Sequence, residues 1–128
     1  MSKLFELYGA SIKKGDYLFC EGDEADYAYM IHKGSVEVNK KTGDKIKRIN
    51  TVGEGEFVGE MAIISGGTRS ANAMAIEECE LIKMDKESFE NSIKENHSFA
   101  IQVIKMLSKR LEETDKALAE AMAALLAK

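Results

Sequence analysis

The glycines of this chain are confined to its first 67 residues. All ten lie at or before Gly67, and beyond Met84 the sequence is instead rich in Ala, Leu, Lys and Glu. Glycine favours turns and weakens helices, whereas those four residues favour helices. We therefore expect a turn-rich β part over about residues 10–84 and helices over about residues 85–127. A length of 128 residues predicts one domain, covering residues 1–128.

Short apolar or alternating runs, separated by turns that contain Gly and Asp, predict the strands. They cover residues 17–20, 27–32, 35–39, 47–52, 72–75 and 80–84. This spacing is typical of a small antiparallel sandwich or barrel. The segment Lys40-Lys41-Thr42-Gly43-Asp44 is expected to be a hairpin loop, because its glycine can adopt the positive φ that such loops need.

Two helices are predicted to close the chain. Asp85 can cap a first helix that runs to about Glu95, and Asn96 can cap a longer second one. Along the second helix, residues recur at alternating steps of three and four, which is the spacing of a seam that packs on a partner helix. The seam comprises Ile104, Leu107, Leu111, Thr114, Leu118, Ala121 and Leu125. We expect a parallel homodimer through this helix; the alternative is that the stripe packs on the chain's own β part.

Composition argues against several functional classes. Eighteen Lys and Arg against twenty-two Asp and Glu give a net charge of -4, so no overall basic field attracts nucleic acid or an acidic membrane surface. No apolar run approaches the roughly 20 residues of a membrane span, and residues 1–14 lack the layout of a secretory signal, so a cytoplasmic protein is expected. Cys20 and Cys79 are expected to be reduced core residues. His32, expected in a strand, and the distant His97 predict no metal site.

The segment most informative about function is residues 53–71. It predicts a short helical turn that begins near Gly59, then a Gly-Gly bend and Arg69 leading into a strand. The first N–H groups of a helix attract anions, and an arginine can add a planar fork of donors. Glu60 opposes a bare anion, but it can accept a hydrogen bond from a hydroxyl of a sugar phosphate. The alternative is a structural ion pair between Glu60 and Arg69 in a surface turn.

Two runs in this segment, residues 57–64 and Thr68-Arg69-Ser70-Ala71, resemble the phosphate-binding cassette of cyclic nucleotide-binding domains. This family supplies the sensor module of catabolite activator protein and of cyclic-nucleotide-dependent kinases. Upstream, residues 14–16, 21–26 and 29–38 match the turn-glycine framework of the family. The resemblance implies a mainly β fold: an antiparallel β-jelly-roll barrel followed by a short helix and a long C-terminal helix.

The resemblance also implies a set of ligand contacts in the cassette: Gly59, Glu60, Met61, Ala62, Arg69, Ser70 and Ala71. In that scheme Glu60 binds the ribose 2′-hydroxyl and Arg69 pairs with the cyclic phosphate. Thr68 stands where the family usually has proline. The bend is then less rigid, which is expected to cost on the order of 1 kcal/mol of binding free energy.

The long helix supplies the remaining contacts that the resemblance implies. Thr114 falls where the family contacts adenine, which favours cyclic AMP, and Arg110 and Asp115 would flank the base. A polar residue in an apolar seam is also explained if its hydroxyl controls the register or bonds back to its own helix. Ser70 is compatible with either purine, so cyclic GMP and other cyclic or dinucleotide ligands stay open.

The functional class expected is a binding and sensing module, not an enzyme. The sequence contains no nucleophile-base pair or metal cluster, and no cofactor is expected. Two histidines far apart in sequence argue against a cupin-like metalloenzyme. The chain ends at Lys128 without a helix-turn-helix segment, so direct DNA binding is not expected. The competing hypothesis is a ligand-independent dimerisation or partner-docking module with the same fold. The sequence leaves open the downstream protein and whether 128 residues is the natural length.

Overall fold

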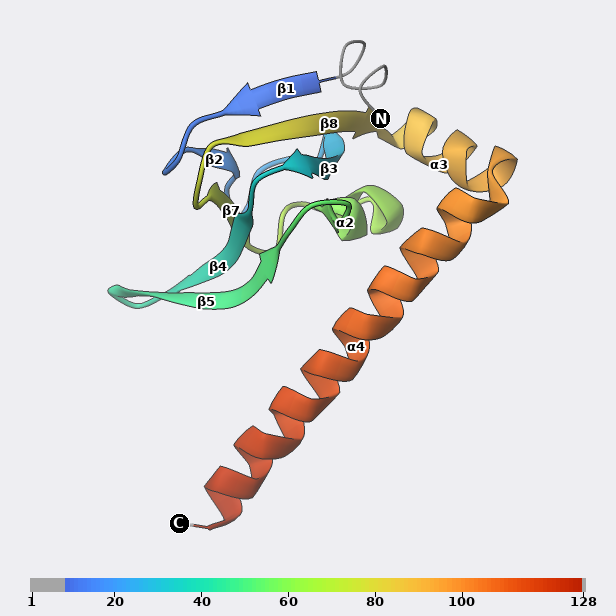
Figure 1. Cartoon of the computed structure of the whole chain (residues 1–128). Coiled ribbons are helices and arrows are strands. Elements are labelled where there is room, and N and C mark those ends of the chain that lie inside the picture. Colours follow the sequence, from blue (N-terminus) through green and yellow to red (C-terminus); the bar gives the residue numbers. More distant parts are fainter. Residues whose placement is uncertain (1–8, 128) are drawn as a thin grey trace. The chain divides into compact units, whose positions relative to one another are not determined.

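The computed structural model describes residues 9–127 (Figure 1). By its internal contacts the chain divides into two compact units, and the boundary falls between Asn91 and Ser92. We call them the β unit and the helical unit and describe each by itself. Within residues 9–127, no helix is both long and apolar enough to cross a membrane.

The β unit contains two four-stranded sheets in which every strand pair is antiparallel. The first sheet has the order β1 (Gly9–Ile12), β8 (Cys79–Asp85), β3 (Tyr27–Lys33) and β6 (Phe57–Val58). The second has the order β2 (Tyr17–Phe19), β7 (Asn72–Ala75), β4 (Val36–Thr42) and β5 (Lys45–Val52). The predicted mainly β, jelly-roll-like fold is confirmed.

The closed barrel is the part of the fold prediction that needs correction. Among the described strands, those at the edges of one sheet do not pair with those of the other. Two of these edge strands are very short, because β6 has two residues and β2 has three. Strands of two and three residues have few backbone groups with which to pair a further strand.

All six predicted strands are present, and β1 and β6 are additional. The predicted hairpin is confirmed with a tighter turn, since β4 continues to Thr42 and β5 begins at Lys45. Gly43 lies in this turn at φ 64°, the left-handed conformation for which glycine was expected.

The hydrophobic core lies within the β unit. Its buried side chains come from six strands, β3 to β8: Ile31, Val36, Val52, Val58, Ala73, Ala75, Cys79 and Leu81. Cys79 is therefore a core residue, as predicted, but the same prediction for Cys20 is wrong. Cys20 follows the end of β2 and is exposed, and its N–H donates to Oδ2 of Asp23 at 2.9 Å. His32 lies in β3, with Nε2 3.9 Å from Oε2 of Glu80.

Three helices are described: α2 (Glu60–Ser65), α3 (Lys86–Glu95) and α4 (His97–Leu126). Both predicted caps are confirmed. Oδ1 of Asp85 accepts from the N–H of Ser88 at 2.8 Å, and Oδ1 of Asn96 accepts from the N–H of Phe99 at 3.1 Å. Each bond satisfies one of the N–H groups that the first turn of a helix leaves unpaired.

Candidate functional site

The segment singled out by the sequence folds around a six-residue helix, α2, bracketed by two glycines. Gly59 is the N-cap at φ 81°, and Gly66 is the C-cap at φ 76°, with its N–H donating to the Ala62 carbonyl at 2.8 Å. Both lie in the left-handed region, where a side chain is strained. The predicted short helix beginning near Gly59 is confirmed.

Gly59 also provides space, but the chain itself occupies it. A Cβ on this residue would lie 2.6 Å from Nη1 of Arg69 and 2.9 Å from Cε2 of Phe19. The resemblance predicted that this glycine lets a ligand approach closely. In this structure the absent side chain instead makes room for an arginine and an aromatic ring.

Arg69 is anchored inside the β unit. The residue is only 4% exposed. Its guanidinium donates from Nη1 to the Gly59 carbonyl at 2.7 Å and from Nη2 to the Tyr27 carbonyl. Its Cζ lies 4.0 Å from the centroid of the Phe19 ring, a cation–π contact. Nε is buried and has no hydrogen-bond partner among the described residues. The arginine is therefore oriented before any ligand is present.

The loop after β2 holds the backbone of Arg69 as well. The N–H of Arg69 donates to the Asp23 carbonyl, and the Arg69 carbonyl accepts from the N–H of Gly22, both at 2.9 Å. Next to this pair, Thr68 forms an isolated antiparallel bridge with Glu24. Thr68 stands at the position where the family usually has proline, and here backbone pairing to the loop orders the bend.

Glu60 lies in the first turn of α2 and is 1% exposed. The alternative that placed Glu60 and Arg69 in a surface turn is therefore wrong, because both residues are buried. Burial lowers the pKa of Arg69, and the negative charges of Asp26, Asp23 and Glu60 act in the opposite direction, as does Tyr29. The Arg69 guanidinium stays positively charged beside these three carboxyl groups, because arginine keeps its proton in proteins.

Aromatic residues around Arg69 were not identified from the sequence. Phe19 of β2 stacks on Tyr29 of β3 with ring centroids 6.3 Å apart, and Tyr27 lies 6.3 Å from Tyr29. Burial raises the pKa of Tyr29, and the charge of Arg69 partly offsets this. These residues are about 40 to 50 positions from Arg69 in the sequence, so no local pattern links them to it.

The other predicted cassette residues lie along the same segment with different exposure. Met61 is 67% exposed and Ala62 is half-buried, while Ser70 is exposed and Ala71 is buried. The structure thus buries Glu60 and Arg69, and it brings Arg69 against the half-buried Gly59. Met61 and Ser70 are at the surface.

Thr114, Arg110 and Asp115 belong to the helical unit, which is described separately from the cassette. The Thr114 hydroxyl donates to the Arg110 carbonyl at 2.8 Å. The backbone bond that was one alternative for this residue is therefore formed. The contact of these three residues with a base stays a prediction.

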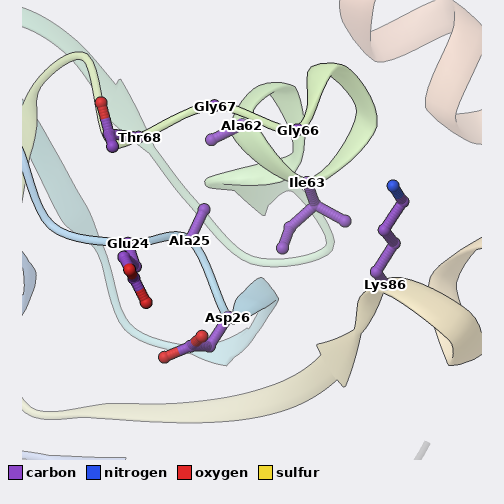
Figure 2. A pocket seen from close by; sticks show the side chains of 9 residues that line it. All are labelled: Glu24, Ala25, Asp26, Ala62, Ile63, Gly66, Gly67, Thr68 and Lys86. Carbon is purple, nitrogen blue, oxygen red and sulfur yellow. The ribbon is translucent and has the colours of Figure 1, made fainter.

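A cavity of about 370 Å³ lies beside the cassette (Figure 2). Its lining comes from the loop before β3, from α2 and its following bend, and from the start of α3: Glu24, Ala25, Asp26, Ala62, Ile63, Gly66, Gly67, Thr68 and Lys86. Ala62 is the single predicted ligand contact in this lining. In the part of the chain from residue 9 to residue 127, no group of three His, Cys, Asp or Glu side chains could hold a metal ion.

Comparison with known proteins decides the family. The family model described as "Cyclic nucleotide-binding domain" matches residues 10–96. The chain belongs to the cyclic nucleotide-binding domain family. The matched range contains the whole cassette, α3 and all strands of both sheets, apart from the first residue of β1. Membership therefore rests on the β unit and the first residues beyond it.

Curated proteins with similar sequences are longer than this chain. It is 30% identical over 110 residues to lysophospholipase nte1 of Aspergillus fumigatus, covering 85% of this chain and 7% of that protein. It is 27% identical over 116 residues to the CRP-like cAMP-activated global transcriptional regulator of Mycobacterium tuberculosis, covering 90% of this chain and 52% of the regulator. The chain thus aligns with only 7% to about half of the length of these relatives.

Similar solved structures agree with the fold. The Thermus thermophilus catabolite activator protein matches with a TM-score of 0.78 and 26% identity over 95% of this chain and 60% of that one. The cAMP-bound form of the EAL enzyme Bd1971 matches with a TM-score of 0.64 and 26% identity over 91% of this chain and 32% of that one.

Proposed function

We propose that this cyclic nucleotide-binding domain binds cyclic AMP, or with lower preference cyclic GMP, in the cassette and acts as a sensor. One observation carries the proposal. Among the described residues only three polar ones are buried, and two of them, Glu60 and Arg69, are opposite charges of the same cassette. Burying a charge is costly unless it is paired and hydrogen-bonded. A ribose phosphate uses both charges, since it offers a hydroxyl and an anion.

The anchored arginine keeps donors for a phosphate. A guanidinium carries five N–H donors, and the bonds to the Gly59 and Tyr27 carbonyls use two of them. The remaining donors, including the buried Nε–H, would pair with the oxygens of a cyclic phosphate once the ligand enters the cassette. Glu60 would accept the ribose 2′-hydroxyl. The amides of Met61 and Ala62, with Ser70 and Ala71, would complete the phosphate contacts.

The preference for cyclic AMP has two supports. The Mycobacterium tuberculosis relative is named as cAMP-activated. Bd1971, which has been solved with cAMP and with cGMP, supports the class of ligand and not the choice between the two. In addition, Thr114 can offer its hydroxyl to an adenine if it leaves the Arg110 carbonyl. Arg110 and Asp115 would flank that base.

We further propose that α4 forms a parallel homodimer and transmits the signal. Four large seam residues are more than half exposed, Ile104 at 61%, Leu111 at 62%, Leu118 at 58% and Leu125 at 67%. Large apolar side chains in a regular helical stripe favour a partner helix. A ligand that binds one arrangement of α4 better than another shifts the population between them.

A second function is favoured by the way Arg69 is held. Both of its terminal nitrogens already donate to carbonyls, and its guanidinium fills the space that Gly59 leaves. The cassette is therefore ordered without a ligand. This supports the alternative of a ligand-independent dimerisation or docking module.

Isothermal titration of the nucleotide-stripped protein with cyclic AMP, cyclic GMP and cyclic di-GMP separates the two functions. The sensor predicts a Kd in the micromolar range or below for cyclic AMP, about -8 kcal/mol. Arg69→Lys and Glu60→Gln should each weaken it by about tenfold or more, since each removes charge-assisted bonds. Arg48→Lys, in an exposed arginine, is the matched control and should not change binding.

If none of the three nucleotides binds, and a thermal transition shows that the protein is folded, the sensor function is rejected and the docking module remains. Binding that survives both cassette substitutions rejects the assigned site. Tighter binding of cyclic di-GMP than of cyclic AMP rejects the proposed ligand but not the cassette.

A further inference from the structure

The hairpin of β4 and β5 concentrates positive charge in an acidic chain. Residues 40–48 contain five of the eighteen Lys and Arg residues and a single acid, Asp44, whereas the whole chain has a net charge of -4. Only Lys40 among the five forms an ion pair within residues 9–127, with Glu21 at 3.8 Å. The basic residues of β5 are all exposed.

β5 is also an open edge. It pairs with β4 on one side and with no described strand on the other. Figure 1 shows the hairpin reaching past the remaining strands of its sheet, and the register between β4 and β7 stops at Asn39. Every second residue of such an edge directs its backbone N–H and C=O away from the sheet, which offers hydrogen bonds to an added strand.

The side chains of β5 favour an added strand of negative charge. Lys45 and Lys47 lie on one face of β5, and Ile46 and Arg48 lie on the other. Lys40 and Lys47 are direct cross-strand partners, a like-charge pair that opposes hairpin stability unless acidic groups surround it. Ile46 and Ile49 are 60% and 58% exposed and offer apolar contact between the charges.

From these features we infer that the β5 edge docks an extended, acidic segment of a partner protein as an added strand. A second copy of β5 is disfavoured, because it would bring Lys and Arg against Lys and Arg. A flat anionic membrane would meet the cations of one hairpin face only. Nucleic acid would leave the two exposed isoleucines without a role. An acidic strand uses the open backbone, both faces of cations and the apolar side chains together.

The test measures binding of labelled eight-residue peptides to the full chain by fluorescence anisotropy at physiological salt. The peptide (Glu-Val)4 matches the eight residues of β5. The peptide (Glu-Pro)4 has the same acidic charge, but its prolines donate no backbone hydrogen bonds. The inference predicts that (Glu-Val)4 binds at least about tenfold more tightly than (Glu-Pro)4, and that (Lys-Val)4 does not bind. Amide exchange should slow in residues 45–52 when (Glu-Val)4 is bound.

Charge reversal of the edge supplies the matched variants. Lys45→Glu with Lys47→Glu should weaken (Glu-Val)4 by about tenfold or more, while Lys105→Glu with Lys109→Glu on α4, which changes the net charge equally, should leave it within about twofold. Equal binding of the two acidic peptides overturns the inference, as does an equal loss in both variants. Stronger binding to phosphatidylserine vesicles or to duplex DNA than to (Glu-Val)4 also overturns it.

Discussion

Gly59 and Arg69 depend on each other. Nη1 of Arg69 donates to the Gly59 carbonyl at 2.7 Å, and a Cβ on Gly59 would lie 2.6 Å from that same nitrogen. The glycine at the start of α2 therefore serves two purposes: it adopts φ 81° and it leaves the space that the guanidinium fills. A side chain at this position would disturb the backbone and the arginine together.

Gly59→Ala should therefore destabilise the fold more than Gly66→Ala, although both replace a left-handed glycine at an end of α2. Gly66 has no atom within 4 Å of its Cβ position, so its substitution costs only backbone strain of about 1 kcal/mol. Gly59→Ala adds a steric conflict and should cost about 2–4 kcal/mol in total. Urea unfolding of the two variants measures the difference, and equal losses would contradict the close approach of Arg69.

Arg69→Ala should lower the free energy of unfolding even without a ligand. The substitution removes a charged donor from the Gly59 and Tyr27 carbonyls and from the ring of Phe19. The expected loss is about 2 kcal/mol. Arg48→Ala, at an exposed arginine, is the control and should change the free energy by less than about 0.5 kcal/mol. An unchanged thermal transition in Arg69→Ala would show that the anchored arrangement contributes nothing to stability.

Phe89→Ala should be among the more damaging substitutions in the β unit. Phe89 is fully buried at the start of α3, and its ring meets that of Phe57 edge to face with centroids 5.9 Å apart. Removing a buried aromatic side chain leaves a cavity and costs about 3–5 kcal/mol. Ile49→Ala, which truncates an exposed side chain, should be nearly neutral. Chemical denaturation tests both, and a small loss for Phe89→Ala would mean that the site collapses around the cavity.

Asp85 makes the start of α3 sensitive to acid. Its hydrogen bond from the Ser88 N–H holds the pKa of the carboxyl below its ordinary value. A lowered pKa contributes stability above the ordinary carboxyl pKa of about 3.9, and this is lost as the pH falls further. Asp85→Asn keeps an oxygen that accepts the bond but does not titrate. The melting temperature of the variant should fall less between pH 6 and pH 3 than that of the parent; parallel curves would contradict the cap as an acid-sensitive group.

Leu118→Asp should turn the proposed homodimer into a monomer. Leu118 lies in the seam of α4 and is 58% exposed, so a carboxylate there would be buried against its own copy in a dimer. Ala123→Asp introduces the same charge away from the seam and should leave the dimer intact. Light scattering during size-exclusion chromatography measures the mass of each. A parent chain that is already monomeric would reject the dimer.

Local patterns were sufficient for much of the fold. The Asp85 and Asn96 caps bond to N–H groups three residues ahead, so the sequence alone identifies both. Strand positions followed from runs of four to six residues between turns. The two strands that were missed, β1 and β6, have four and two residues. The two residues of β6 are too few to show an alternation of their own. β1 is as long as β7, which was predicted, and is defined by its pairing with β8.

In the site, too, the features set by consecutive residues were predictable and those set by distant residues were not. Glycine spacing and one arginine sufficed to predict a short helix with a charged cassette, because a helix end and its glycine cap are properties of consecutive residues. The burial of Glu60 and Arg69 was not predictable in this way, and a surface turn remained an equal alternative. The carbonyl that anchors Nη2 of Arg69 lies 42 residues away in β3, and the ring beneath the guanidinium lies in β2.

The sequence by itself determined the elements whose causes are local: the turns at glycine, the helix caps, the mainly β division of the chain and the family motif. Only the tertiary structure decided which of the two cysteines predicted as core residues is buried, that the sheets have open edges, and that Arg69 is held by Gly59, Tyr27 and Phe19. The physical reason is that burial and hydrogen-bond partners depend on which distant segments pack together. The local sequence pattern does not indicate which distant segments pack together.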